Sequence, residues 1–290
     1  MLAPVYAYPI LPNGGLGNRL FAWARCKVYS ELNRVPMITP SWTQVKLGPM
    51  LRGERDWRWY TGEFQALPSE IMGWHKRRLL WTQPRLPEPH ELTSLQAAGA
   101  GGIQIFSGWS DYFTRLNGQH GLIRRALESA CQPRWMERVN AVPHAPMAMH
   151  VRRGDLKNAQ GEFLTSLSWF ESVVKVVRNV SGVERPIQLF SDGKEEEVAP
   201  LLRLPNVFRV NTGSAIGDLL AMARAKFLIA SGGSTFSTWA GFLGQMPVLT
   251  PPGHPLSYYG LKLPAEIFSG EFDPHAAPPA AFIETLKRIE

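Results

Sequence analysis

Cysteine is scarce in this chain, and so are the features that mark secreted or membrane-spanning proteins. The two cysteines, Cys26 and Cys131, cannot form a disulfide framework, and alone they cannot supply the roughly four ligands of a structural zinc site. No lysine or arginine precedes Arg19, so the N-terminus lacks the basic region of a signal peptide. No apolar run reaches the roughly 18 residues that span a membrane. The sequence therefore predicts a cytoplasmic protein in a reducing compartment.

Several catalytic motifs are also missing. The chain has no Asp-x-Asp, which argues against a mechanism in which carboxylates hold a divalent cation on a diphosphate. It has no His-Glu-x-x-His and no Gly-x-Ser-x-Gly, so zinc hydrolases, proteases and lipases are excluded. The glycine-rich run at residues 13–18 lacks the spacing of a dinucleotide-binding fingerprint and the lysine of a P-loop. Neither a dinucleotide-binding fold nor a Walker NTPase is therefore supported.

Positive charge, in contrast, is in excess. The 31 lysines and arginines outnumber the 24 acidic residues and give a formal net charge of +7. Such a chain attracts anions, whether nucleic acid, acidic lipid, phosphate or nucleotide, and charge alone does not choose among them. Hydrophobic residues make up 44% of the 290 residues and charged ones 19%, which is typical of a folded globule of one large domain or two ordinary ones.

The second half of the chain alternates strands with helices. Apolar runs predict strands at residues 147–151, 187–191, 207–210, 227–230 and 248–250, and the segments between them predict helices at 169–180, 195–202, 218–225 and 235–243. Ser168 and Glu171, three residues apart, resemble a capping box at the start of the first helix. This alternation predicts a parallel sheet that is covered on both faces.

The first half opens in a similar way. An extended apolar segment at residues 5–11 precedes a glycine-rich turn and a helix with apolar residues every four positions, and a short apolar run follows at 37–39. Residues 40–100 are rich in proline, tryptophan and arginine and have no clear period. The prolines at 143 and 146 predict a boundary between an N-terminal domain, 1–143, and a C-terminal domain, 144–273, followed by a helical tail, 274–290. The expected fold class is α/β, with two Rossmann-like parallel-sheet domains facing a cleft.

Two arginines follow the first strand of the second half. In the run His150-Val151-Arg152-Arg153-Gly154-Asp155, both guanidinium groups stand at the carboxyl end of a strand, where ligands of open α/β sheets bind. Arginine forms bidentate hydrogen bonds with phosphate, so this pair is a candidate anion site. The alternative is a surface pair bridged to Asp155.

Three further polar segments lie at strand ends or helix starts. The loop Ser231–Ser237 precedes a helix, whose N-terminus favours an anion, and Ser234, Thr235 and Ser237 add hydroxyl donors. The alternative is an ordinary strand-to-helix turn with an N-cap. Asp192 closes the strand at 187–191, and Asp218 opens a helix. Asp218 either complements the helix dipole or accepts hydrogen bonds from a base or ribose.

Four segments, taken together, resemble family 11 glycosyltransferases, the α-1,2-fucosyltransferases, and more widely the fucosyltransferases that share a His-x-Arg-Arg motif. In family order they are residues 14–21 (GGLGNRLF), which contain Asn18, residues 108–113 (GWSDYF), residues 150–155 (HVRRGD), and residues 218–223 (DLLAMA) running into 234–239 (STFSTW). Phe190-Ser191-Asp192 lies between them. Any one segment is a weak signal, whereas the ordered set is fairly specific.

The resemblance implies a GT-B fold, GDP-fucose as the donor, no metal or other cofactor, and inversion at the anomeric carbon. It makes 1–143 the acceptor-side domain and 144–273 the nucleotide-sugar-binding domain. On the matching positions, it implies that Arg152 binds the β-phosphate of GDP and that His150 and Asp218 lie at the guanine nucleoside. It places Ser234, Thr235, Phe236 and Ser237 along the diphosphate. Asn18, Arg153 and Asp192 complete the expected substrate-binding set, and Asp155 and Glu162 are the candidate catalytic bases nearest in sequence.

The chain also departs from the family pattern. Arg19-Leu20 stands where the family usually has Gln-Met, Leu156 where an aromatic residue follows, Gly193 where a second aspartate follows Asp192, and Gly233 where an asparagine often stands. These differences affect the expected identity of the acceptor and of the donor sugar more than the expected binding of the diphosphate. A transferase that uses another GDP-sugar therefore remains an alternative.

Two further alternatives come from the arginine-rich stretch with Trp57, Trp59, Trp74 and Trp81. Aromatic rings among arginines stack on nucleic-acid bases and also suit a membrane surface. The expected partners are GDP-fucose and a glycan or lipid-linked oligosaccharide acceptor of surface polysaccharide synthesis. A peripheral contact with the inner membrane stays open, and no specific nucleic acid is expected.

Overall fold

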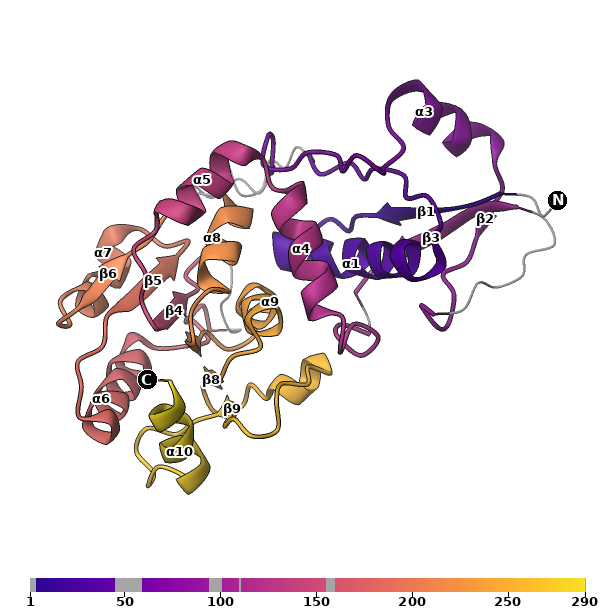
Figure 1. Cartoon of the computed structure of the whole chain (residues 1–290). Coiled ribbons are helices and arrows are strands. Elements are labelled where there is room, and N and C mark those ends of the chain that lie inside the picture. The colour runs from indigo at the N-terminus through magenta and orange to yellow at the C-terminus, as the bar shows by residue number, and fades with distance from the viewer. Residues whose placement is uncertain (1–3, 45–58, 94–100, 110, 155–159, 290) are drawn as a thin grey trace. The chain divides into compact units, whose positions relative to one another are not determined.

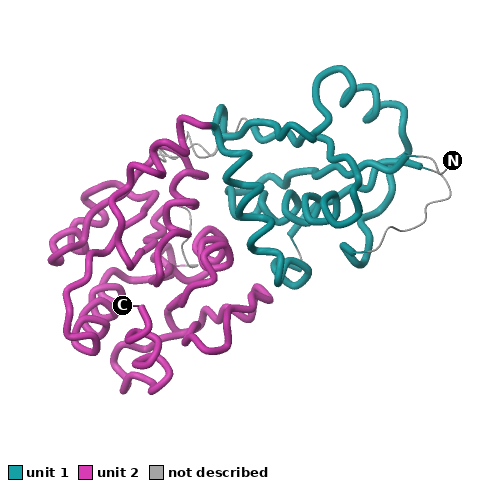
Figure 2. Tube along the Cα trace, viewed as in Figure 1, with its two compact units in different colours: residues 1–45, 58–132 teal, residues 46–57, 133–290 magenta. Residues whose placement is uncertain are grey.

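The computed structural model describes residues 4–44, 59–93, 101–109, 111–154 and 160–289. Figure 2 shows that these residues form two compact units. Unit 1 holds the described residues up to Gln132, and unit 2 begins at Pro133. The functional division at residue 143 and the separate tail from residue 274 stay predictions.

Unit 1 is built on a small parallel sheet. Its three strands run in the order β1 (Val5–Ile10), β3 (Gly102–Ser107) and β2 (Arg85–Leu86). The helix α1 (Leu16–Asn33) begins after the glycine-rich turn and buries most of its residues, which include Phe21, Trp23 and Tyr29. The helices α3 (Gly73–Thr82) and α4 (His120–Ala130) complete the unit (Figure 1).

Unit 2 contains the larger sheet, whose six parallel strands run in the order β6-β5-β4-β7-β8-β9. The predicted strands are confirmed at β4 (Met147–Val151), β5 (Ile187–Ser191), β7 (Phe227–Ala230) and β8 (Val248–Thr250), and β6 (Val207–Arg209) ends one residue early. The edge strand β9 (Gly270–Glu271) was not expected. Every residue of the central strand β4 is buried, because helices cover both of its faces.

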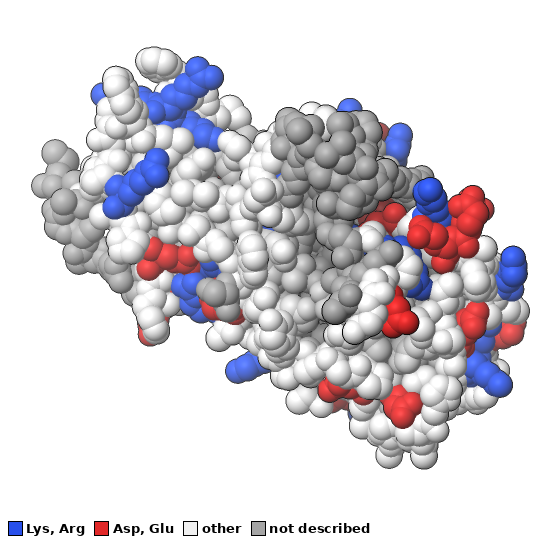
Figure 3. All heavy atoms as spheres, turned by 180° about the vertical axis from the view of Figure 1, so that it is seen from behind, with Lys and Arg blue, Asp and Glu red and all other residues white. Residues whose placement is uncertain are grey.

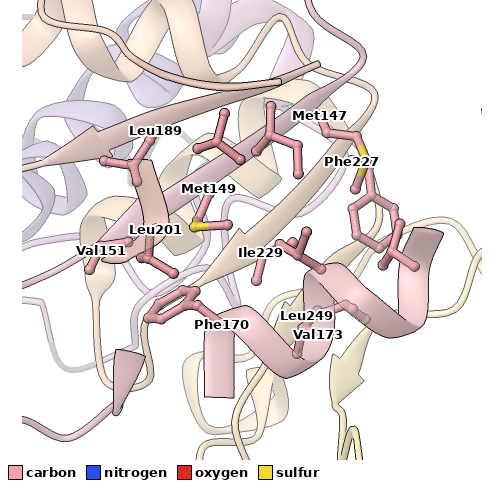
Figure 4. Packing of buried hydrophobic residues seen from close by; sticks show 14 of the residues in the cluster. Met147, Met149, Val151, Phe170, Val173, Leu189, Leu201, Phe227, Ile229 and Leu249 are labelled. Atoms are coloured by element: carbon pink, nitrogen blue, oxygen red, sulfur yellow. The ribbon is translucent and has the colours of Figure 1, made fainter. Parts of the chain in front are cut away.

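Helices lie on both faces of this sheet (Figure 1). The elements are α5 (Pro133–Ala141), α6 (Leu167–Ser181), α7 (Glu195–Leu202), α8 (Ala215–Met222), α9 (Thr235–Gly244), a short 3-10 helix at Leu256–Tyr259 and α10 (Ala280–Arg288). Figure 4 shows Phe170 and Val173 of α6 packed beneath Met149 and Ile229 of the sheet. The helix α10 adds Phe282 and Leu286 to the same core.

Two helix starts differ from the sequence predictions. The N-cap of α6 is Ser166, whose hydroxyl accepts a hydrogen bond from the Trp169 N–H at 3.2 Å, and Ser168 lies inside the helix. The predicted capping box at Ser168 is therefore wrong. The helix α8 begins at Ala215 with Ser214 as its N-cap, so Asp218 lies in the first turn rather than at the start.

The described residues contain no helix that is both long enough and apolar enough to cross a bilayer. Both cysteines are free and buried.

The cap of α6 can be tested with two neighbouring serines. We expect Ser166→Ala to lower the free energy of unfolding by about 1 kcal/mol, because it leaves the Trp169 N–H without its acceptor. Ser168→Ala is the matched control and should change it by less than about 0.5 kcal/mol, since its hydroxyl is exposed. Urea unfolding followed by circular dichroism measures both. Equal losses for the two variants would contradict this assignment.

Candidate functional site

The carboxyl end of β4 is held by a carboxylate from the next strand. Asp192, directly after β5, accepts hydrogen bonds from the backbone N–H groups of Arg153 and Gly154 at 2.7 and 3.1 Å. Its Oδ2 also forms an ion pair with Nη1 of Arg152 at 2.6 Å. The sequence predicted Asp192 as a substrate-binding residue, and in the structure it orients the arginine run.

The Arg153 side chain turns into unit 2. Its exposed fraction is 4%, and its guanidinium carbon lies 4.5 Å from the centre of the Phe163 ring. Nη1 donates to the Thr165 carbonyl at 3.2 Å, whereas Nε and Nη2 are buried and have no hydrogen-bond partner among the residues that the structure describes. Burial lowers the pKa of Arg153 from its usual value. The Nε and Nη2 groups of Arg153 are thus available to donate hydrogen bonds to an anion that reaches them.

A glycine makes room for this arginine. A Cβ atom on Gly193 would lie 2.8 Å from Cγ and 2.9 Å from Cβ of Arg153, closer than van der Waals contact allows. The guanidinium of Arg209, from the end of β6, donates from Nη2 to the carbonyls of Ser191 and Gly193 at 3.2 and 2.5 Å. The glycine at position 193 therefore belongs to the packing of Arg153.

His150 links β4 to α9. Its Nδ1 lies 2.5 Å from the Ser237 hydroxyl, and its ring centre lies 5.2 Å from that of Phe236. Burial lowers the pKa of His150 to about 4; the charge of Asp192 acts in the opposite direction, and that of Arg152 lowers it further. The imidazole is therefore neutral at neutral pH.

The loop before α9 is tied to the same strand end. The Ser231 hydroxyl accepts from the Arg152 N–H at 2.8 Å and donates to the His150 carbonyl at 3.1 Å. Ser234 is the N-cap of α9, and its hydroxyl accepts from the Ser237 N–H at 3.4 Å. Ser234 and Ser237 are buried, while Thr235 and Phe236 remain partly exposed. The positive end of the α9 dipole thus lies next to the two arginines in the fold.

Thr165 joins the two loops. Its carbonyl accepts from Arg153, and its hydroxyl accepts from the Gly232 N–H at 2.9 Å. Gly232 cannot carry a side chain here, because a Cβ atom would lie 2.3 Å from Cδ2 of His254. One threonine therefore fixes the spacing between the arginine run and the loop before α9.

Asp218 stabilises a neighbouring loop. Its Oδ1 accepts from the N–H and the hydroxyl of Thr212 at 2.7 and 2.8 Å, and the Thr212 carbonyl accepts from Arg138 at 3.1 Å. The carboxylate fixes the turn between β6 and α8. A contact with a base or ribose stays a prediction.

The other predicted residues lie apart from these contacts. Asp155 lies outside the described residues. Glu162 is exposed and directly precedes Phe163, the residue beneath Arg153. Asn18 belongs to unit 1, in the first turn of α1, where its N–H donates to the Gly15 carbonyl at 3.1 Å.

The structure adds positioning residues that the sequence did not single out, namely Thr165, Arg209 and His254, and it gives Gly193 and Ser231 a positioning role. Arg209 interrupts the apolar run 207–210, and a charged residue inside such a run was a usable signal. The contacts of Thr165 and His254 join distant segments and leave no local pattern. In the described ranges, no group of three or more His, Cys, Asp and Glu side chains could hold a metal ion.

Comparisons with known proteins support the fold. No protein-family model and no curated protein matches the sequence. The solved structure of the fucosyltransferase NodZ from Bradyrhizobium matches with a TM-score of 0.55 and 16% identity, over 87% of this chain and 97% of that chain. A NodZ α-1,6-fucosyltransferase soaked with GDP-fucose matches with a TM-score of 0.53 and 14% identity, over 86% and 96%. Arabidopsis thaliana FUT1, solved as a mutant in complex with GDP, matches with a TM-score of 0.52 and 12% identity, over 87% and 72%.

These similarities concern the fold, because the identities are low. The α/β class with two parallel sheets is confirmed, and the chain has the GT-B fold of the fucosyltransferase structures.

The role of Gly193 predicts a specific loss of stability. We expect Gly193→Ala to lower the free energy of unfolding by about 1–3 kcal/mol, because the new methyl group overlaps Arg153. Gly121→Ala is the matched control: it lies in α4, and an added Cβ would lie 3.5 Å from Nη1 of Arg125, so alanine should stabilise by about 0.5–1 kcal/mol. Urea unfolding measures both. A neutral Gly193→Ala would contradict the packing argument.

The buried His150 predicts a pH dependence. Its pKa is lower in the folded chain than the usual 6.5, so the unfolded chain binds more protons between pH 6.5 and about 4. Stability should therefore be complete above pH 6.5 and fall by about 3 kcal/mol as the pH decreases to 4.

We expect His150→Asn to reduce this slope, since the variant has no imidazole to protonate. His144→Asn, at an exposed histidine, is the control and should keep the wild-type slope. Urea unfolding from pH 7 to pH 4 gives all three slopes. A wild-type slope in His150→Asn would contradict the assigned titration.

Proposed function

We propose that this chain is an inverting glycosyltransferase that transfers fucose from GDP-fucose to a hydroxyl of a glycan acceptor. Support comes from the GT-B fold and from the ordered fucosyltransferase motifs. The finer assignment, to α-1,2-fucosyltransferases of family 11, rests on the motifs alone.

One observation carries the proposal: the arginine run after β4 and the N-terminus of α9 are built into a single frame. His150 binds Ser237 of α9, and Ser231 accepts from the Arg152 N–H. This frame combines two guanidinium groups with a helix N-terminus, and both favour a phosphate. A nucleoside diphosphate is the ligand that fits this chemistry.

The donor would contact this frame through its diphosphate and through its guanine nucleoside. We assign the β-phosphate to Arg152 and the diphosphate to residues Ser234, Thr235, Phe236 and Ser237, with Arg153 contributing donors from beneath. The guanine nucleoside is assigned to His150 and Asp218. The neutral imidazole suits this role, because it adds no charge beside an uncharged base.

The proposed reaction breaks the bond between fucose and the β-phosphate. Negative charge then develops on the leaving GDP and positive charge on the sugar. A guanidinium that is fixed before the reaction stabilises the developing anion without reorganising. Asp192 supplies that fixation, since it holds both Arg152 and the backbone of the turn. The chain's own cations can thus do this work without a metal ion.

The acceptor hydroxyl would attack from the opposite face, helped by a carboxylate base. Asp155 and Glu162 remain the proposed bases, and Asn18 remains a proposed substrate-binding residue. A glycan or lipid-linked oligosaccharide of surface polysaccharide synthesis is the proposed acceptor.

Loss of the Arg152 guanidinium should weaken GDP binding. We expect Arg152→Ala to raise the dissociation constant by about 10–100-fold, because charge-assisted hydrogen bonds contribute about 1.5–3 kcal/mol. Arg152→Lys should recover part of this loss, since it keeps the charge but not the fork of donors. Calorimetry with GDP in the presence of EDTA measures the affinity, and transfer from GDP-fucose measures activity.

Arg203→Ala is the matched control, because Arg203 is an exposed arginine at the C-cap of α7 in the same unit. It should bind GDP as the wild type does. Undiminished binding by Arg152→Ala would refute the assigned phosphate role, and a wild-type protein that binds no GDP would refute the transferase. A thermal-shift screen of nucleotide sugars identifies the donor, since the cognate ligand stabilises the folded state.

A further inference from the structure

The helix α3 has an inner face that is fixed to unit 1. Leu79 is buried in a cluster with Ile38 and Ile103. Nζ of Lys76 donates to the Thr39 carbonyl at 2.6 Å and lies 5.5 Å from the centre of the Tyr8 ring. These contacts hold the helix and determine which side chains face outward.

The outer face of α3 carries two tryptophans. Trp74 is 77% exposed and Trp81 is 90% exposed, and Met72, just before the helix, is 56% exposed. Seven residues are about two helical turns, so the two indoles lie on one face about 10 Å apart along the axis. Arg77 and Arg78 are exposed between them and flank the line that joins the indoles.

This face is positively charged. It carries Arg77 and Arg78, and residues 71–87 contain no acidic residue. Within the described part of the chain, Arg77 and Arg78 form no ion pair. Figure 3 shows Lys and Arg side chains gathered over the α3 end of unit 1.

The nearest acidic residues in sequence are occupied elsewhere. Glu88 forms ion pairs with Arg25 at 2.6 Å and with Arg115 at 2.5 Å. Glu70 accepts from the Leu67 N–H at 3.1 Å, and burial raises its pKa. Neither carboxylate offsets the charge of the outer face.

We propose that the outer face of α3 (Met72, Trp74, Arg77, Arg78 and Trp81) docks on a lipid bilayer that contains anionic lipid. Indole rings favour the boundary between headgroups and acyl chains, because they combine a large apolar area with one N–H donor. The two arginines lie at the level where lipid phosphates stand, and each basic residue near such a surface contributes to binding. A helix that lies along the surface inserts both indoles at once.

The geometry favours a bilayer over nucleic acid. Proteins bind single strands in charged grooves whose aromatic rings stack successive bases. Trp81 is 90% exposed, so the residues that the structure describes do not enclose it in such a groove. An outward-facing helix matches an extended surface instead. The proposal is independent of the proposed chemistry in unit 2.

Vesicle sedimentation tests this surface. We expect the full chain to bind vesicles of equal parts phosphatidylglycerol and phosphatidylcholine and not vesicles of phosphatidylcholine alone. Trp74→Ala combined with Trp81→Ala should weaken binding at least about tenfold, because it removes the inserted apolar area. Arg77→Gln combined with Arg78→Gln should weaken it about 30-fold, or about fivefold for each arginine.

Matched controls are Tyr258→Ala, which removes an aromatic ring that is 68% exposed, and Arg203→Gln, which removes an exposed charge. Both should bind as the wild type does, and urea unfolding should show that every variant is folded. GDP binding should persist in the α3 variants, which separates this test from that of the donor site.

Three results would overturn the proposal. They are a wild-type chain that does not bind the anionic vesicles, α3 variants that bind them as tightly as the wild type, and tryptophan-dependent binding to a single-stranded oligonucleotide with no binding to vesicles.

Discussion

The arrangement of the candidate site depends on the carboxylate of Asp192. The parallel register pairs Val151 with Ser191, so the residue after β5 reaches the residues after β4. Asp192 accepts two backbone N–H groups of the turn and pairs with Arg152, and these three donors fix the path of the chain. That path leaves Arg152 partly exposed and directs Arg153 into the interior. A side chain without two acceptor oxygens could not hold both the turn and the guanidinium.

Much of unit 2 was predictable because its strands are buried on both faces. Such strands are continuously apolar, as at Met147–Val151 and Phe227–Ala230, so their bounds follow directly from where the apolar run begins and ends. The observed strand bounds agree with the prediction. Helix starts were less predictable, because several residues near each start can act as a cap. Ser166 and Ser168 both precede apolar residues at helical spacing, and only the Trp169 hydrogen bond distinguishes them. The same ambiguity placed the start of α8 at Asp218.

The rest was unpredictable for two physical reasons. The helix α3 has apolar residues on both faces, with Leu79 buried and Trp74 and Trp81 exposed, so the one-sided period that marks a surface helix is absent. In the site, the decisive contacts join segments far apart in sequence, as when Gly232 donates to Thr165. Such a contact depends on loop geometry, which no local pattern encodes. The motifs indicated the chemistry of the site, whereas the structure was needed to find what holds it.

The arginines of the chain stand in two different environments, one buried and one exposed to solvent. Arg153 is buried with two donors that the described residues leave unsatisfied, and burial of unsatisfied polar groups is costly. An anion that reached those donors would offset the cost, and bulk salt would screen the contact weakly because it is buried. Arg77 and Arg78 are exposed and give up little hydration until a surface approaches them. The contacts that Arg77 and Arg78 make with such a surface are screened by salt and reversible. Rising ionic strength should therefore release the α3 face from an anionic surface, whereas an anion held by the buried donors of Arg153 should stay bound.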